Sequence, residues 1–316
     1  MGKWVGLMFL ALAGYSARGP VQGAIVASSA LVLSTILAPL VVVSSAIVAL
    51  IWMRLGATSG LITVGVSLLF STTIALMTSL PVLAPVAVMV SSWLPVIVMA
   101  WVLRDTVRLD MAILAGAVLV ATVLVAVYAA IPDVAGSWRR LFSSVFENPQ
   151  LLPGQLQEMD PQLRERMLTT ASRYITGLYG AMWFFLAALS LLLARSWQAH
   201  LFNPGGLQKE FHELRFGRVA SAASLIIAGA AVVTRFELLM AIAMLAVAVF
   251  ALQGIAVLHG VVRRRGLGAA WLVAAYVLIL LTMPESLIAL AFCGATDAWF
   301  DFRKRAGEVP VDNDQQ

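Results

Sequence analysis

Charged side chains are scarce in this chain of 316 residues, and their scarcity excludes most soluble folds. Only 12% of the residues are Asp, Glu, Lys or Arg, whereas 61% are hydrophobic. Soluble domains carry about 25% charged and about 45–50% apolar residues, so a soluble core of this size has no room for so many apolar side chains. The apolar residues form long runs rich in Ala, Val and Leu. They predict an all-α, polytopic integral membrane helix bundle without strands.

Cysteine and histidine are also rare, which limits the chemistry the chain can perform. Cys293 is the single cysteine, so a disulfide framework and a cysteine metal cluster are excluded. His200, His212 and His259 fall at the ends of apolar runs without metal-ligand spacing, and we interpret them as interface residues. The expected spans contain no His-Glu-x-x-His pattern and no pair of nucleophile and base. We therefore expect neither an enzyme, nor a cofactor, nor a metal site.

The net charge of +5 does not indicate nucleic-acid binding. The basic residues lie at the ends of apolar runs and do not gather on one soluble face. Such a distribution is typical of proteins whose Lys and Arg residues remain in the cytoplasm. The lipid bilayer is therefore the expected partner, and nucleic acid is not.

The last apolar block shows how the spans are arranged. Arg263–Arg265 open it, Arg303–Arg305 close it, and Pro284-Glu285 interrupt it. One helix of about 34 residues would extend roughly 50 Å, whereas a hydrocarbon core is about 30 Å thick. We therefore expect two helices that form a hairpin with its basic ends in the cytoplasm and Pro284 at an outer turn.

The same pattern recurs along the chain and gives a model of about ten spans, or about eight if short hairpins are re-entrant. Both termini are expected in the cytoplasm of a bacterial cell, with the protein in its cytoplasmic (inner) membrane, because most of the 21 Lys and Arg residues then lie inside. The other expected spans are 21–37, 40–53, 59–79, 82–103, 111–130, 174–194, 219–234 and 238–258.

The remaining segments belong to the same single membrane domain, residues 1–316. Residues 4–17 are too short to span comfortably, and we expect an interfacial or partial helix, with a cleaved signal peptide as the alternative. Residues 131–172 are expected to form an outer amphipathic loop, residues 195–218 a cytoplasmic one, and residues 306–316 a disordered tail.

The outer loop contains two expected helices. The first has an apolar face formed by Trp138, Leu141, Phe142, Val145 and Phe146, at helical spacing. The second begins at Asp160-Pro161, an N-cap followed by proline, and we expect it to continue into the span at 174–194. This segment is either a connecting loop with surface helices or a lid over a cavity.

Candidate substrate-binding residues lie mostly at the edges of spans: Trp93, Arg235, Glu237, Glu285 and Asp297. Ser91–Pro95 interrupts a span, and transporters expose backbone to substrates at such breaks. The alternatives are a kink at Pro95, solvated turns for Arg235, Glu237 and Glu285, and an ion pair of Asp297 with Arg303 or Lys304.

A short amphipathic helix is expected in the cytoplasmic loop and could contact a protein partner. Its apolar residues are Leu207, Phe211 and Leu214. The candidate partner-binding residues are Phe211, His212, Leu214 and Arg215.

Three segments carry a resemblance: NPGGLQKEFHELRFGR, LPVIVMAWVLRDTV and GATDAWFDFRKR. Together they resemble the YybS-like family of uncharacterised bacterial polytopic membrane proteins. That family is distantly similar to the substrate-binding subunits of energy-coupling-factor vitamin transporters, which have six spans and a pocket open to the outside. The resemblance implies a membrane location, and the family has no assigned activity or catalytic residues to carry over.

Two functions from different classes follow. The first is transport-type binding of a small molecule from the outer side, beneath the 138–170 segment. The second is a non-transporting scaffold or assembly partner that works through its cytoplasmic face. An intramembrane enzyme is the weakest alternative, because the spans lack paired catalytic groups.

Overall fold

The computed structural model describes residues 2–77, 81, 83–146 and 159–307, and all regular secondary structure in these residues is helical. The predicted all-α class is confirmed for this part of the chain. The helices are α1 (Gly2–Ser16), α2 (Pro20–Leu33), α3 (Leu40–Leu55), α4 (Ala57–Met77), α5 (Leu83–Thr106), α6 (Leu109–Ala130), α7 (Val134–Phe146), α9 (Pro161–Phe202), α10 (Gly206–His212), α11 (Gly217–Thr234), α12 (Glu237–Arg264), α13 (Ala269–Leu281), α14 (Glu285–Phe300) and α15 (Phe302–Gly307). Most of the predicted tail at 306–316, and residues 147–158 of the predicted outer loop, lie outside the described residues.

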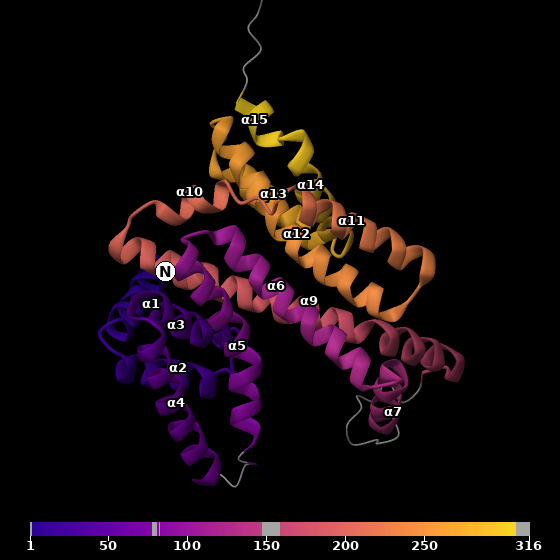
Figure 1. Ribbon diagram of the computed structural model, residues 1–316, viewed down its shortest axis with the longest axis horizontal. Coiled ribbons are helices and arrows are strands. Elements are labelled where there is room, and N and C mark those ends of the chain that lie inside the picture. The colour runs from indigo at the N-terminus through magenta and orange to yellow at the C-terminus, as the bar shows by residue number, and fades with distance from the viewer. Residues whose placement is uncertain (1, 78–80, 82, 147–158, 308–316) are drawn as a thin grey trace, which may run out of the picture.

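Six of these helices are long and apolar enough to cross a membrane: α4, α5, α6, α9, α11 and α12. The chain is therefore a multi-pass helical membrane protein. The helices α2, α3 and α13 are apolar but shorter. Figure 1 shows α1–α5 on one side and α11–α14 on the other, with α6 and α9 running between them.

Helix α9 is the longest and connects the two sides of the bundle. It runs unbroken for 42 residues, because the predicted helix start at Asp160 continues through the apolar span and on to Phe202. The Asp160 carboxylate accepts hydrogen bonds from the backbone N–H groups of Gln162 and Leu163, at 2.7 and 3.1 Å. These bonds satisfy donors that an uncapped helix start leaves free. Helix α9 packs against α3, α5, α6, α7 and α12.

The predicted hairpin around Pro39 is present, but its first helix ends earlier than expected. Helix α2 ends at Leu33, and just after it Ser34 Oγ and Thr35 Oγ1 donate to the backbone oxygens of Leu31 and Val32, at 2.6 and 2.7 Å. Hydroxyl groups that bond the local backbone in this way compete with continuation of a helix. Helix α3 then returns along α2, and Ser44 Oγ donates to the Ala27 oxygen at 2.8 Å.

The predicted break at Ser91–Pro95 is instead a continuous helix. Pro95 lies inside α5, and it has no N–H to donate to the Ser91 oxygen one turn earlier. The indole N–H of Trp183 on α9 donates to that oxygen. Ser45 Oγ on α3 donates to the neighbouring Ser92 oxygen at 3.2 Å. Neighbouring helices thus satisfy the freed backbone, as membrane helices with internal proline require.

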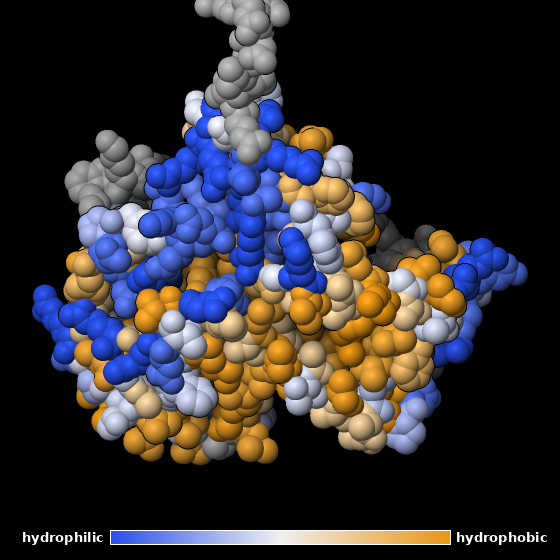
Figure 2. All heavy atoms as spheres, turned by 45° about the horizontal axis from the view of Figure 1, so that its top comes forward, coloured by the Kyte–Doolittle hydropathy of each residue, from blue (hydrophilic) through white to orange (hydrophobic). Residues whose placement is uncertain are grey.

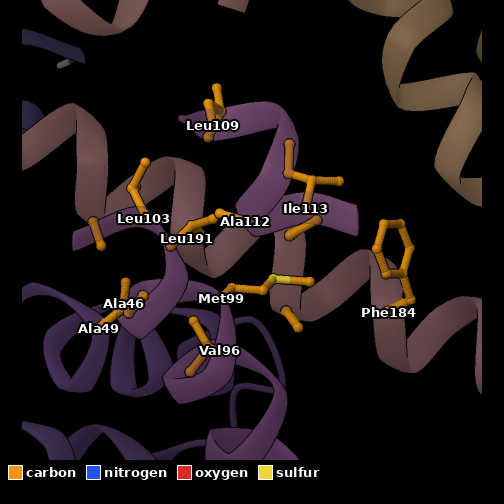
Figure 3. Packing of buried hydrophobic residues seen from close by; sticks show 14 of the residues in the cluster. Ala46, Ala49, Val96, Met99, Leu103, Leu109, Ala112, Ile113, Phe184 and Leu191 are labelled. Atoms are coloured by element: carbon orange, nitrogen blue, oxygen red, sulfur yellow. The ribbon is translucent and has the colours of Figure 1, made fainter. Parts of the chain in front are cut away.

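The core lies where α3, α5, α6 and α9 meet. Met99, Ile113 and Leu191 are fully buried there, among small residues such as Ala46 and Ala112 (Figure 3). Small side chains allow membrane helices to approach closely, and close approach supplies most of their attraction because lipid is as apolar as the core.

The bundle has two distinct ends. We call the end formed by α10 and α15 the α10 end, and the opposite end, near α7, the α7 end. Hydrophilic residues gather over the α10 end, and hydrophobic residues cover the surface below it (Figure 2). Arg54 lies 3.6 Å from the Phe202 ring centroid, and Arg104 Nη1 donates to the Trp52 oxygen at 3.1 Å. These contacts join the last turns of α3, α5 and α9 at the α10 end.

Candidate functional sites at the two ends of the bundle

A buried ion pair lies where α14 ends. Asp297 is 0% exposed and Arg303 is 1% exposed, and Arg303 Nη2 lies 2.6 Å from Asp297 Oδ2. The chain turns at Asp301, whose φ of 45° is in the left-handed region, and α15 then packs against α12. The Phe302 N–H then donates to Asp297 Oδ1 at 3.0 Å. This turn makes possible an ion pair between residues that are close in sequence.

A second arginine completes the cluster from the segment before α11. Arg215 Nε lies 3.2 Å from Asp297 Oδ2, and Arg215 Nη2 bonds the Asp301 carboxylate. The hydrogen bond from Arg215 lowers the pKa of Asp301, although partial burial opposes this effect. Burial lowers the pKa of Arg303, and its hydrogen bond with Asp297 opposes that change. Two carboxylates and two guanidinium groups therefore balance each other in charge.

Arg303 also joins two further segments through hydrogen bonds. Its Nη1 donates to the His212 oxygen of α10 at 2.7 Å, and its own backbone oxygen accepts from Arg264 Nη1 of α12 at 3.0 Å. The side chain passes over Gly260, where a Cβ would lie 2.9 Å from Arg303 Cδ. We name Asp297, Asp301, Arg215 and Arg303 the ionic cluster. It holds α10, α12, α14 and α15 together.

Gln253 is a buried polar residue that our sequence analysis did not select. Its Nε2 donates to the Gly294 oxygen of α14 at 2.5 Å, and its Oε1 accepts from the Phe216 N–H at 2.9 Å. Gly254 and Gly294 let α12 and α14 cross closely, since a Cβ at Gly254 would lie 2.1 Å from the Leu290 oxygen. The available signal was a single amide next to a glycine inside an otherwise apolar run.

An apolar cavity lies at the α7 end, between α5, α6, α7 and α9. Its volume is about 450 Å³, and we name it the α7 cavity. It is lined by Ser91, Val120, Val123, Leu124, Val127, Ile131, Val134, Ser137, Trp138, Leu141, Thr176, Tyr179, Gly180 and Trp183. A smaller cavity of about 160 Å³ between α3, α5 and α9 shares Ser91, Tyr179 and Trp183 with it.

Helix α7 is held over this cavity by polar contacts to α9. Trp138 Nε1 donates to Thr176 Oγ1 at 2.8 Å, and Arg139 pairs with Glu165. Trp138 also stacks on Phe142, with 5.7 Å between ring centroids. The predicted apolar face of α7 therefore points in part towards the protein, where Trp138 and Leu141 line the cavity.

The predicted substrate-binding residues do not come together. Trp93 is 1% exposed and donates from Nε1 to Ser44 Oγ at 3.1 Å, so it is a core residue and not a cavity residue. Arg235 and Glu285 are exposed and Glu237 is partly exposed, each at a turn or helix start, and none of the three lines either cavity near α7. Asp297 lies at the α10 end, in the ion pair with Arg303 that we expected as the alternative.

The predicted partner-binding residues are largely occupied by contacts within the chain. Leu214 is 2% exposed, and Phe211 packs edge-on against His259, with 5.9 Å between ring centroids. Arg215 belongs to the ionic cluster. Helix α10 ends at His212, so Leu214 lies beyond it and turns into the core. The apolar side of this short helix is therefore packed in part against the protein itself.

The three histidines show no arrangement for metal binding in the part of the chain that the structure describes, where no group of three or more His, Cys, Asp or Glu residues could hold an ion. His259 Nε2 lies 2.8 Å from the Tyr276 hydroxyl, and its ring lies 5.9 Å from that of His212.

Comparison with protein-family models, with curated proteins and with solved structures finds no match to this chain.

Proposed function

We propose that this chain is a protein of the bacterial cytoplasmic membrane that binds an apolar or amphipathic small molecule in the α7 cavity, as a transport-type binding protein. The observation that carries this proposal is the cavity itself. Its volume of about 450 Å³ falls within the range of small-molecule sites, roughly 300–1,000 Å³. The resemblance to the YybS-like family, with its distant similarity to transporter binding subunits, agrees with this function.

In this proposal the α7 end faces outward and the α10 end faces the cytoplasm. The basic residues expected inside, such as Arg54, Arg104 and Arg195, make their contacts at the α10 end. Both termini lie inside in this orientation, whether the bundle has about ten spans or fewer. Helices α2 and α3, with 14 and 16 residues, extend about 21 and 24 Å. They are shorter than a hydrocarbon core of about 30 Å, which favours a re-entrant pair.

The lining of the α7 cavity indicates the chemistry of its ligand. Aliphatic side chains of α6 form one wall, and Tyr179 and Trp183 of α9 form another. The indole N–H groups of Trp138 and Trp183 are already engaged, so the rings offer their faces. Only a few hydroxyl groups remain for polar contacts. An apolar or amphipathic molecule therefore fits better than a charged one.

Native mass spectrometry of the full chain, released from detergent, tests this proposal. We expect a copurified small molecule on the wild-type protein. Val127→Trp fills the cavity and should remove the bound mass, because Val127 lines it. Val125→Trp on the same helix is the matched control, since Val125 is 45% exposed on the outer surface. A wild-type protein without bound mass, or equal occupancy in both variants, contradicts the proposal.

The alternative function is a scaffold that binds a protein partner at its cytoplasmic face. Its predicted apolar contacts, Phe211 and Leu214, pack inside the chain, which leaves a mainly polar surface for such a partner. A partner protein bound in fixed stoichiometry in the same mass spectra would favour this alternative.

A further inference from the structure

Two polar cavities meet at the α10 end, and no residue of the α7 cavity belongs to them. One has a volume of about 860 Å³ and the other about 320 Å³. They share His212, Glu213 and Arg264, and we name them together the α10 cleft. Helix α10 forms one wall, the last turn of α12 another, and α15 closes one side. Figure 2 shows this part of the surface as strongly hydrophilic.

Positive charge is in excess in the α10 cleft. The carboxylates of Glu210 and Asp301 are engaged, by Arg195 and Arg215 respectively. Within the described residues, four lining cations make no ion pair with a carboxylate: Lys209, Arg263, Arg264 and Lys304. Glu213 is the one remaining lining carboxylate without an ion pair in the same residues. The cleft therefore favours an anion.

Two buried polar atoms at the base of the cleft have no hydrogen-bond partner among the described residues. They are Arg303 Nε and His212 Nδ1. Arg303 is almost fully buried and lines the smaller cavity, while His212 lines both cavities. A buried polar atom without a partner is costly and rare in proteins, and an anion in the cleft would supply a partner for these atoms.

We propose that the α10 cleft binds a phosphate group, carried by a soluble anion or by a lipid headgroup. Phosphate suits the observed side chains, because its several charged oxygens can each accept from Arg or Lys, and guanidinium groups match its geometry. Arg263, Arg264 and Lys209 surround the larger cavity, and Lys304 extends the positive surface to the smaller one. The proposal is independent of the function proposed for the α7 cavity.

Calorimetric titration of the full chain in nanodiscs at fixed ionic strength tests the proposal. In the first arm, discs of neutral phosphatidylcholine receive inorganic pyrophosphate. In the second arm, the discs also contain phosphatidylglycerol, and native mass spectrometry counts the retained anionic lipids. Saturable pyrophosphate binding identifies a soluble phosphate ligand, whereas retained phosphatidylglycerol without pyrophosphate binding identifies a headgroup. The absence of both overturns the proposal.

The variants separate this site from general surface charge. Arg263→Gln should weaken binding by about tenfold, and Lys209→Gln combined with it by more, because each removes a charge-assisted contact of roughly 1.4 kcal/mol. Arg265→Gln is the matched control, since Arg265 is an exposed neighbour that lines neither cavity. An equal loss of binding affinity in Arg265→Gln and Arg263→Gln would show that the general surface charge, and not this site, attracts the anion. Thermal unfolding midpoints close to wild type confirm that each variant is folded.

Discussion

Asp297 and Arg303 form the most buried ion pair among the described residues, with 2.6 Å between Oδ2 and Nη2. The two residues belong to different helices, and the left-handed turn at Asp301 brings them together. Removing one partner of a buried pair leaves the other charge without compensation. The pair is therefore a structural requirement for the α10 end.

Asp297→Asn should destabilise the protein by about 3–5 kcal/mol, because Arg303 and Arg215 then lack their shared carboxylate. Thermal unfolding in detergent measures this loss. Glu165→Gln is the control, since its pair with Arg139 is half exposed on both sides and is worth about 0–1 kcal/mol. A midpoint for Asp297→Asn as high as that of Glu165→Gln would contradict a structural role.

Gly254→Ala should separate α12 from α14. The added Cβ would lie 2.1 Å from the Leu290 oxygen, which is backbone and cannot move alone. We expect a loss of about 1–3 kcal/mol, in the range of overpacked cores. Gly229→Ala on α11 is the control, because a Cβ there has no neighbour within 4 Å. That variant should match or exceed wild-type stability, since Ala favours a helix over Gly.

Trp183→Phe should leave the Ser91 oxygen without its donor and cost about 1–3 kcal/mol. The Ser91 oxygen depends on this indole because Pro95 has no N–H to donate to it. Pro95→Ala supplies that N–H and should therefore reduce the cost of Trp183→Phe. A double-mutant cycle of unfolding free energies measures this coupling. Strictly additive effects would mean that the indole does not replace the hydrogen bond removed by proline.

Stability should fall as the pH drops through about 6.5, the ordinary pKa of histidine. Burial, with the charges of Arg263, His259 and Arg303, lowers the pKa of His212 in the folded protein. The unfolded chain then binds more protons than the folded one in this range, and acid favours unfolding. In His212→Gln, the unfolding midpoint should therefore change less with pH between pH 7.5 and 5.5 than it does in the wild-type protein.

His200→Gln provides the comparison for this measurement, because His200 is exposed. It should retain the wild-type pH dependence. The lowered pKa of Asp301 acts in a separate window, since the stabilisation from its pair with Arg215 is lost only in strong acid, below about pH 4. Identical curves for wild type and His212→Gln would exclude His212 as the origin of the loss near pH 6.5.

The all-α fold class and several helix boundaries were predictable because they depend on local sequence patterns. Pro39 and Pro284 separate helices, and Asp160-Pro161 starts α9, because proline and a capping carboxylate act on their own backbone. The end of α2 at Leu33 was less predictable, because the apolar run continues beyond it to Pro39.

Site residues were less predictable because their roles depend on contacts across the bundle. The ion pair of Asp297 with Arg303 was predictable as the alternative to substrate binding, because the two residues are close in sequence. Trp93 was misplaced, because its burial depends on Ser44 of another helix. The α7 cavity depends on four helices, and no sequence window contains the residues that line it.

Helix α9 contacts both candidate sites. Thr176 and Trp183 line the α7 cavity, while Arg195, further along the same helix, binds Glu210 of α10. A helix of 42 residues is about 63 Å long, and this one contains no proline after its first position. A tilt imposed near Thr176 would therefore move Arg195 and the wall of the α10 cleft in the same motion. The α7 cavity and the α10 cleft are therefore joined by one continuous helix.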